Sequence, residues 1–135
     1  MKKILPALLA LALFSPGALA ASERANTLLI HPGETCYAKF AVNGTKLKLL
    51  GVTKEKDDAA QLVVTMTPDP ATKNFTLKVE NRFKQDLDYA GEIRSLTRDI
   101  RTQVPLVPVV AGKLSLEQLP MRVEEMALFG FKLEK

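Results

Sequence analysis

The sequence predicts an all-β fold, namely a single immunoglobulin-like antiparallel β-sandwich of about seven short strands. Three observations lead to this class. Apolar and polar residues alternate with a period of two over much of the chain, which is typical of strands with one buried face. Turn-forming residues interrupt the alternation about every ten residues, and helical signals are few. A small β-barrel is the alternative, because it gives the same pattern.

Residues 1–20 have the pattern of a secretory signal peptide. Lys2 and Lys3 give a positive start, "ILPALLALALF" is an apolar stretch, and "SPGALA" ends in small residues, which predicts cleavage after Ala20. The apolar stretch is shorter than the roughly 20 residues that a membrane-spanning helix needs. We therefore expect a periplasmic or secreted bacterial protein with no retained transmembrane helix.

The remaining segment, 21–135, has the length of one domain with one hydrophobic core. Loss of Lys2 and Lys3 lowers Lys plus Arg from 19 to 17 against 15 acidic residues, so the net charge falls from +4 to +2. Nucleic acid is not an expected partner, because no basic stripe is interleaved with stacking aromatic residues. The single cysteine cannot form a disulfide within the chain, so the fold depends on hydrophobic burial.

The clearest structural unit is the hairpin predicted in "CYAKFAVNGTKLKLLGV", residues 36–52. Asn43 and Gly44 are predicted to form a two-residue type I′ turn, since both tolerate a positive φ. Pairing outward from this turn places Lys39 opposite Lys48 and sorts the side chains into an apolar inner face and a mostly polar outer face. The predicted inner row consists of Cys36, Ala38, Phe40, Val42, Leu47 and Leu49.

A charged surface loop over 53–60 leads to a second predicted hairpin. Its strands are "QLVVTMT" and "FTLKVENRF", and "PDPATKN" connects them. The stretch "TLKVENRFKQDLDYAGEI", which begins in the second of these strands, resembles bacterial immunoglobulin-like domains in architecture, and this resemblance implies no activity. The predicted inner row consists of Leu62, Val64, Met66, Phe75, Leu77, Val79 and Phe83.

The C-terminal third is less regular. Segment 92–102 fits either a short helix or a loop followed by a strand. Pro105 and Pro108 lack an amide donor, so 103–110 is predicted as an edge strand or an extended segment. Segment 111–120 is predicted as a turn region. The inner rows of the strands on either side consist of Leu87, Tyr89 and Ile93, and of Ala127, Phe129, Phe131 and Leu133.

His31 and Cys36 are the only histidine and the only cysteine, and both lie in "LLIHPGETCYAKF". The alternation turns Cys36 toward the core, where a free thiol is inert, so we expect a structural pair. A blue-copper site needs two histidines and a zinc site several Cys or His ligands, so neither metal nor any other cofactor is predicted. The alternative function is a carrier of a metal or a small ligand, with the candidate ligands His31, Cys36, Met66, Met121 and Met126.

Catalysis is the less favoured class, because the chain lacks the common hydrolase motifs and has one imidazole. A small hydrolase would depend on two carboxylates that converge in space. The acidic pairs that are close in sequence are Asp57 with Asp58, Asp86 with Asp88, and Glu124 with Glu125. No catalytic residue is predicted.

Cationic side chains form the candidate interaction surface. Opposed lysines on paired strands are destabilising, so an anionic partner or the acids of another loop are expected to offset Lys39 and Lys48. Protection of a strand edge against aggregation is the simpler explanation. We expect an exported, non-enzymatic binding or accessory protein of the envelope, either an inhibitor or an assembly module, whose partner is another envelope protein or an anionic envelope component. The candidate surface residues are Lys39, Lys46, Lys48, Arg94, Arg98 and Arg101.

Overall fold

The computed structural model describes residues 25–72, 74–95, 100–119 and 122–135. The predicted signal peptide and its cleavage position lie outside these residues. The described part contains antiparallel strands and no helix, and hence no helix that is long and apolar enough to cross a membrane. Its strands are β1 (Leu28–Ile30), β2 (Thr35–Asn43), β3 (Lys46–Thr53), β4 (Leu62–Pro68), β5 (Phe75–Asn81), β6 (Leu87–Ser95), β7 (Ile100–Val104), β8 (Leu114–Leu119) and β9 (Glu125–Leu133).

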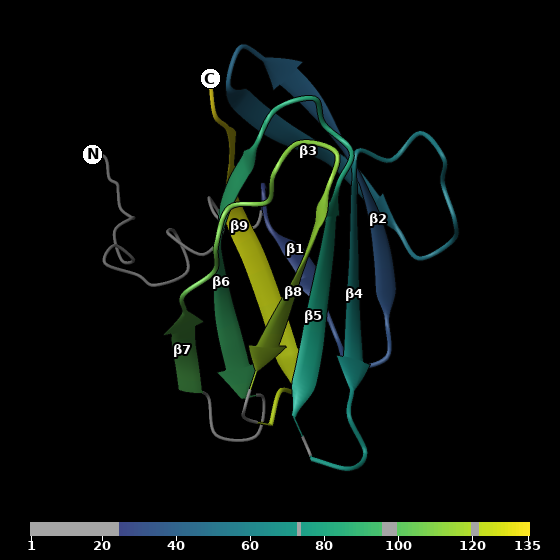
Figure 1. Cartoon of the computed structure of the whole chain (residues 1–135), viewed down its shortest axis with the longest axis vertical. Helices are drawn as coiled ribbons and strands as arrows, with labels where there is room; N and C mark the ends of the chain where they lie inside the picture. Colours follow the sequence, from purple (N-terminus) through teal and green to yellow (C-terminus); the bar gives the residue numbers. More distant parts are fainter. Residues whose placement is uncertain (1–24, 73, 96–99, 120–121) are drawn as a thin grey trace, which may run out of the picture.

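All nine described strands belong to one sheet in the order β7-β6-β9-β3-β2-β4-β5-β8, and β1 pairs with β9 beside this path. The sheet curls around a single interior like half of a barrel (Figure 1). The predicted all-β antiparallel class is therefore confirmed. The immunoglobulin-like sandwich is not confirmed, because the strands form one continuous hydrogen-bonded sheet in place of two separate ones.

The core fills the concave side of this sheet. The inner rows predicted for β4 and β5 are largely confirmed, since Leu62, Val64, Met66, Leu77 and Val79 are all fully buried and Phe83 is nearly so. Aromatic rings link the two halves of the sheet. Phe40 packs edge-on against Phe131 at a centroid distance of 5.1 Å, and Tyr89 stacks on Phe131 at 6.4 Å.

The β2–β3 hairpin is confirmed, but its register differs from the prediction. Asn43 pairs with Lys46, so the two-residue loop is Gly44-Thr45, with Gly44 at φ 66°. The pairing shifts by two residues from the turn to Phe40, which preserves the two faces, and by three residues beyond the bulge at Leu50. Cys36, Ala38, Phe40 and Leu47 are buried as predicted. Val42 is an exception, because it lies near the exposed end of the hairpin.

A β-bulge in β9 corrects the prediction for the last strand. Gly130 has φ +66°, and the pairing with β6 skips from Asp88↔Lys132 to Ala90↔Phe129. The extra residue changes which alternate side chains point inward. Ala127, Phe131 and Leu133 are buried as predicted. Before the bulge, however, Met126 and Leu128 are also fully buried, while Phe129 is only partly buried.

Three other segments bear on the predictions. Residues 114–119, expected as part of a turn region, form strand β8, and their alternation of leucine with polar residues is the signal that the prediction missed. The described parts of 92–102 belong to the end of β6 and the start of β7, and 96–99 lie outside the described residues. β7 is an edge strand, and 105–108 continues it without regular structure, as predicted for the proline-containing segment.

Hydrogen bonds from the buried side chain of Asn81 attach the segment after β7 to the sheet. Asn81 is 1% exposed, and its Nδ2 donates to the carbonyls of Gln85 and Val109 at 2.9 Å each. Its Oδ1 accepts from the amide of Phe83 at 2.8 Å. The amide and carbonyl of Val109 also pair with those of Leu87 at 2.9 Å. A buried amide side chain is stable here because these contacts satisfy it.

Candidate functional site

His31 lies directly after β1, in the turn that leads to β2. The backbone reverses at Gly33, which has φ +85°, and Gly33 donates its amide to the carbonyl of Met66 at 2.8 Å. This turn brings Glu34 back to the histidine. Glu34 Oε1 accepts from the His31 amide at 2.9 Å and lies 3.1 Å from His31 Nδ1. The sequence "HPGE" thus places a carboxylate against one ring nitrogen by local geometry alone.

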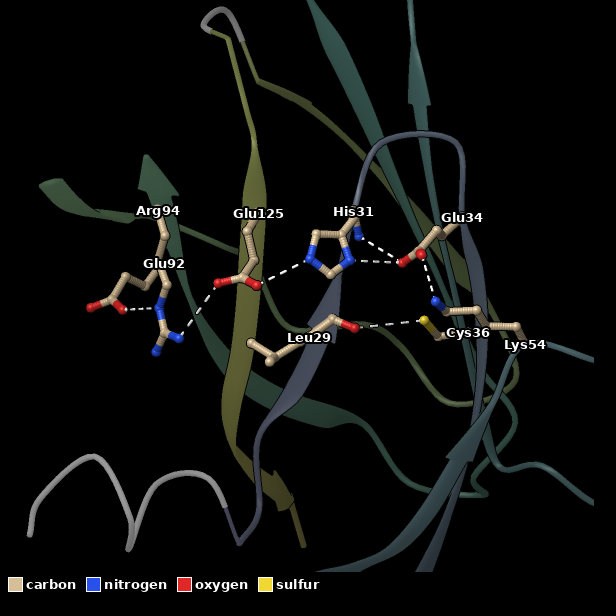
Figure 2. Close-up of polar contacts among 8 residues, drawn as sticks. All are labelled: Leu29, His31, Glu34, Cys36, Lys54, Glu92, Arg94 and Glu125. Carbon is tan, nitrogen blue, oxygen red and sulfur yellow. Dashed lines mark hydrogen bonds and ion pairs between the residues drawn. The ribbon is translucent and has the colours of Figure 1, made fainter. Parts of the chain in front are cut away.

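The second ring nitrogen faces a carboxylate from the other end of the chain. His31 Nε2 lies 3.0 Å from Glu125 Oε2, the two residues being 94 positions apart (Figure 2). The β1–β9 pairing explains this contact, because Ile30 pairs with Met126 and the next pair outward would be His31 with Glu125. The imidazole is therefore held between two carboxylates.

Two cations extend the cluster (Figure 2). Lys54 Nζ lies 2.6 Å from Glu34 Oε2, and this hydrogen bond is the main reason why the pKa of Glu34 falls to about 2. The same contact raises the pKa of Lys54. On the other side, Arg94 Nη1 lies 3.7 Å from Glu125 Oε1, and Arg94 Nε donates to Glu92 Oε2 at 2.8 Å. We call these six residues, Lys54, Glu34, His31, Glu125, Arg94 and Glu92, the histidine clasp.

The geometry of the histidine clasp suits non-covalent contacts between strands better than proton transfer to a substrate. An imidazolium donates from both ring nitrogens, so one ring can bind Glu34 and Glu125 at once. A catalytic histidine needs one nitrogen directed at a nucleophile or a substrate. Both nitrogens of His31 are already directed at carboxylates. The clasp therefore joins β1, β9 and β6 to the β1–β2 turn.

Cys36 takes no part in the hydrogen bonds of the histidine clasp. The side chain is fully buried, and its sulfur is directed at the Leu29 carbonyl at 3.8 Å, whereas the His31 ring is directed at the two carboxylates (Figure 2). Burial is the main cause that raises the pKa of the thiol to about 11. Cys36 is thus held as a protonated thiol in the core, where it fills space as a small apolar side chain.

The candidate metal ligands are dispersed in the fold. Met66 and Met126 are buried in the core, and Met121 lies outside the described residues. Within the part of the chain that the structure describes, no three His, Cys, Asp or Glu side chains converge in a way that could hold a metal ion.

In each acidic pair named as a candidate for hydrolysis, one carboxylate is bound by another part of the chain. Asp57 accepts from the amide of Ala59, which is the main cause that lowers the pKa of Asp57, and also binds Lys39. Asp86 accepts from the amide of Ala111 at 2.9 Å. Glu124 accepts from the Ser95 hydroxyl at 2.9 Å. In these contacts the carboxylates stabilise the positions of loops and strand ends.

The structure rearranges the predicted cationic surface. Lys39 lies opposite Gly51 and Lys48 opposite Ala41, so the predicted opposition of Lys39 and Lys48 is wrong, because the register shifts and a bulge follows at Leu50. Asp57 of the 53–60 loop binds Lys39 at 3.2 Å, which is the compensation by a loop acid that the sequence suggested.

A different pair of lysines is opposed. Lys46 of β3 pairs directly with Lys132 of β9, and the sequence did not reveal this pair because it depends on the β3–β9 pairing. The Arg94 side chain belongs to the histidine clasp and lies opposite Arg101 on β7, while Arg98 lies outside the described residues.

Exposed apolar side chains lie further along β3, after Lys48. Leu50 is 63% exposed and Val52 is 42% exposed. Together with Tyr37 they line a shallow, open depression of about 340 Å³ between Lys39 and the end of β3. We call Lys46, Lys48, Lys132 and Leu50 the lysine surface.

Comparison with known proteins gave no match to a family model, to a curated protein or to a solved structure. The function is therefore inferred from the chemistry of the chain itself.

Proposed function

We propose that this chain is an exported, non-enzymatic binding protein of the bacterial envelope, which docks an anionic envelope component on the lysine surface. The short antiparallel strands around one core provide the scaffold that presents this surface. Export is supported by the charged start, the apolar stretch and the small residues of segment 1–20.

One observation carries the binding function. Lys46 and Lys132 are direct partners on neighbouring strands, so their side chains leave the sheet on the same face. Like charges at this spacing repel, and no acidic side chain of the described residues forms an ion pair with either lysine within 4.0 Å. An anionic ligand would relieve the repulsion.

The chemistry of the other polar clusters supports a function without catalysis. His31 directs both ring nitrogens at carboxylates, and Cys36 is a buried thiol whose pKa is raised to about 11. The side chains most apt for acid–base or nucleophilic work are thus engaged in holding the fold together.

Two measurements test this function. The full chain is expressed in a bacterium, and fractionation with mass spectrometry should find it outside the cytoplasm with Ala21 as its N-terminus. The exported protein should then sediment with isolated envelope membranes, and this binding should be lost in a variant with K46Q and K132Q and retained in the matched variant with K84Q and K113Q. A cytoplasmic chain with an intact N-terminus, or binding to envelope membranes that is equal in both variants, contradicts the proposal.

A further inference from the structure

We propose that the occupant of the lysine surface is the headgroup layer of an anionic phospholipid bilayer. This inference rests on the proposed function and names the partner of the same surface. Four features of the molecule support it, namely the face that these side chains share, the lack of acidic partners, the place of β3 in the sheet and the exposed apolar side chains beside the lysines.

The three lysines are on one face. Lys46 and Lys132 are cross-strand partners, and Lys48 follows Lys46 by two residues on the same strand, so it points to the same side. Leu50 comes next along β3, at the bulge, and is the most exposed large apolar side chain among the described residues. The surface therefore presents three ammonium groups beside one exposed aliphatic side chain.

The acids around this surface leave it cationic. Asp57 is paired with Lys39 at 3.2 Å. Asp88 of β6 lies opposite Lys132 on the other side of β9, but the described residues contain no ion pair between them. Lys46 and Lys48 face Asn43 and Ala41 across β2, and neither of these is acidic.

Protection of a sheet edge does not explain the opposed pair Lys46 and Lys132. Edge strands carry lysine to prevent pairing with other chains. However, β3 lies inside the sheet between β9 and β2, while the edges of the main path are β7 and β8. Lys46 and Lys132 are at the one position where β3 and β9 pair, so no strand edge is exposed there.

The shape of the surface favours a bilayer over a polypeptide. The depression beside Leu50 is shallow and open, so it offers little enclosure to a partner side chain. Residues 41–44 at the end of the hairpin are exposed on both faces of the strand. Lysines attract anionic lipids, and neighbouring aliphatic side chains add affinity by entering the boundary between headgroups and acyl chains.

Co-sedimentation with vesicles tests the inference, with the exported protein purified from cells. Binding is expected to vesicles of equal parts phosphatidylglycerol and phosphatidylcholine, and not to phosphatidylcholine alone. It should weaken strongly as ionic strength rises. Since each lysine near such a surface is worth about a fivefold change in partitioning, the variant with K46Q, K48Q and K132Q should bind about 100-fold more weakly.

The matched control is a variant with K56Q, K84Q and K113Q, which has the same net charge and changes exposed lysines elsewhere. It should keep most of the binding, whereas Leu50→Ser should lower partitioning several-fold without a change in net charge. Equal losses in the two lysine variants, or binding that does not depend on anionic lipid, overturn the inference. If lipid vesicles do not bind the protein but its binding to envelope membranes still depends on Lys46 and Lys132, the inference falls and the proposed function stands, with an acidic protein as its partner.

Discussion

His31 Nε2 lies 3.0 Å from Glu125 Oε2 and thereby joins two segments that are 94 residues apart. The contact links the β1–β2 turn to β9, and Arg94 continues it to β6. The histidine ring is 41% exposed, so water and salt weaken the electrostatic part of this link. The histidine clasp therefore adds a modest amount of stability and fixes the orientation of the β1–β2 turn.

A double-mutant cycle should detect this link. With His31→Gln, Glu125→Gln and the double variant, we expect a coupling free energy of about 0.5–1 kcal/mol in urea unfolding, as for a partly exposed hydrogen bond. Glu55, an exposed acid of the 53–60 loop, serves as the control partner in the variant Glu55→Gln. A coupling free energy near zero for His31 with Glu125 would show that the two side chains act independently.

The pKa of Glu34 predicts how the stability depends on acidity. Its folded pKa is about 2 against a usual value of 4.5, so the ionised form is favoured by folding. The contribution of Glu34 is therefore complete above about pH 4.5 and is lost as the pH falls from about 4.5 toward 2. We expect the free energies of unfolding of the wild type and of Glu34→Gln to converge over this range.

Lys54 supplies the main cause of that shift, so it provides the control. In Lys54→Met the carboxyl of Glu34 should titrate at a higher pH, as observed by NMR, and the acid-sensitive range should move upward with it. An unchanged titration of Glu34 in this variant would contradict the assigned cause.

Burial of Cys36 predicts a protected thiol. The side chain is fully buried and its pKa is about 11, so both access and ionisation are disfavoured at neutral pH. A thiol reagent should fail to modify the folded protein and should modify one thiol per chain in urea, with Cys36→Ala as the blank. Rapid modification in the absence of denaturant would show that the sulfur is accessible.

Much of the fold could be predicted where strands are regular. β4 and β5 pair without a bulge from Leu62↔Asn81 to Pro68↔Phe75, and simple alternation identified most of their buried side chains. Val63, assigned to the opposite row, is also buried, and Phe75 is only partly buried. In β9 the bulge at Gly130 changes the inward set, and alternation alone cannot place such a change. In the β2–β3 hairpin the register shift and the bulge at Leu50 together separated Lys39 from Lys48, while the buried residues of β2 up to Phe40 were predicted correctly.

The two candidate sites depend on pairings between distant strands, and this is why the sequence did not reveal them. Glu34 could have been linked to His31 from the three-residue spacing across the Pro32-Gly33 turn. Glu125 and Lys132, however, meet their partners only because β9 pairs with β1 and β3. No local pattern specifies which strands of a sheet become neighbours.

The opposition of Lys46 and Lys132 predicts that this surface lowers stability when nothing is bound. Opposed like charges on paired strands cost about 0.2–1 kcal/mol, so Lys132→Gln should raise Tm slightly while it weakens binding. Lys84→Gln, which changes an exposed lysine outside the sheet, is the matched control and should leave Tm unchanged. A fall in Tm for Lys132→Gln would mean that an attractive contact of Lys132 outweighs the repulsion.

Substitution of Gly130 directly tests the backbone conformation of the bulge in β9. At φ +66° a side chain with a Cβ is strained, although the nearest atom to that Cβ would be the Ala90 Cβ at 3.9 Å, an ordinary contact. Gly130→Ala should therefore lower the free energy of unfolding by about 1 kcal/mol through backbone strain and not through a clash. Gly51→Ala, on an exposed strand position with open space and no positive φ, should have little effect. The bulge turns Phe131 toward Phe40. A change in unfolding free energy near zero for Gly130→Ala would therefore indicate that β9 can straighten without losing that aromatic contact. The core would then have to be packed differently.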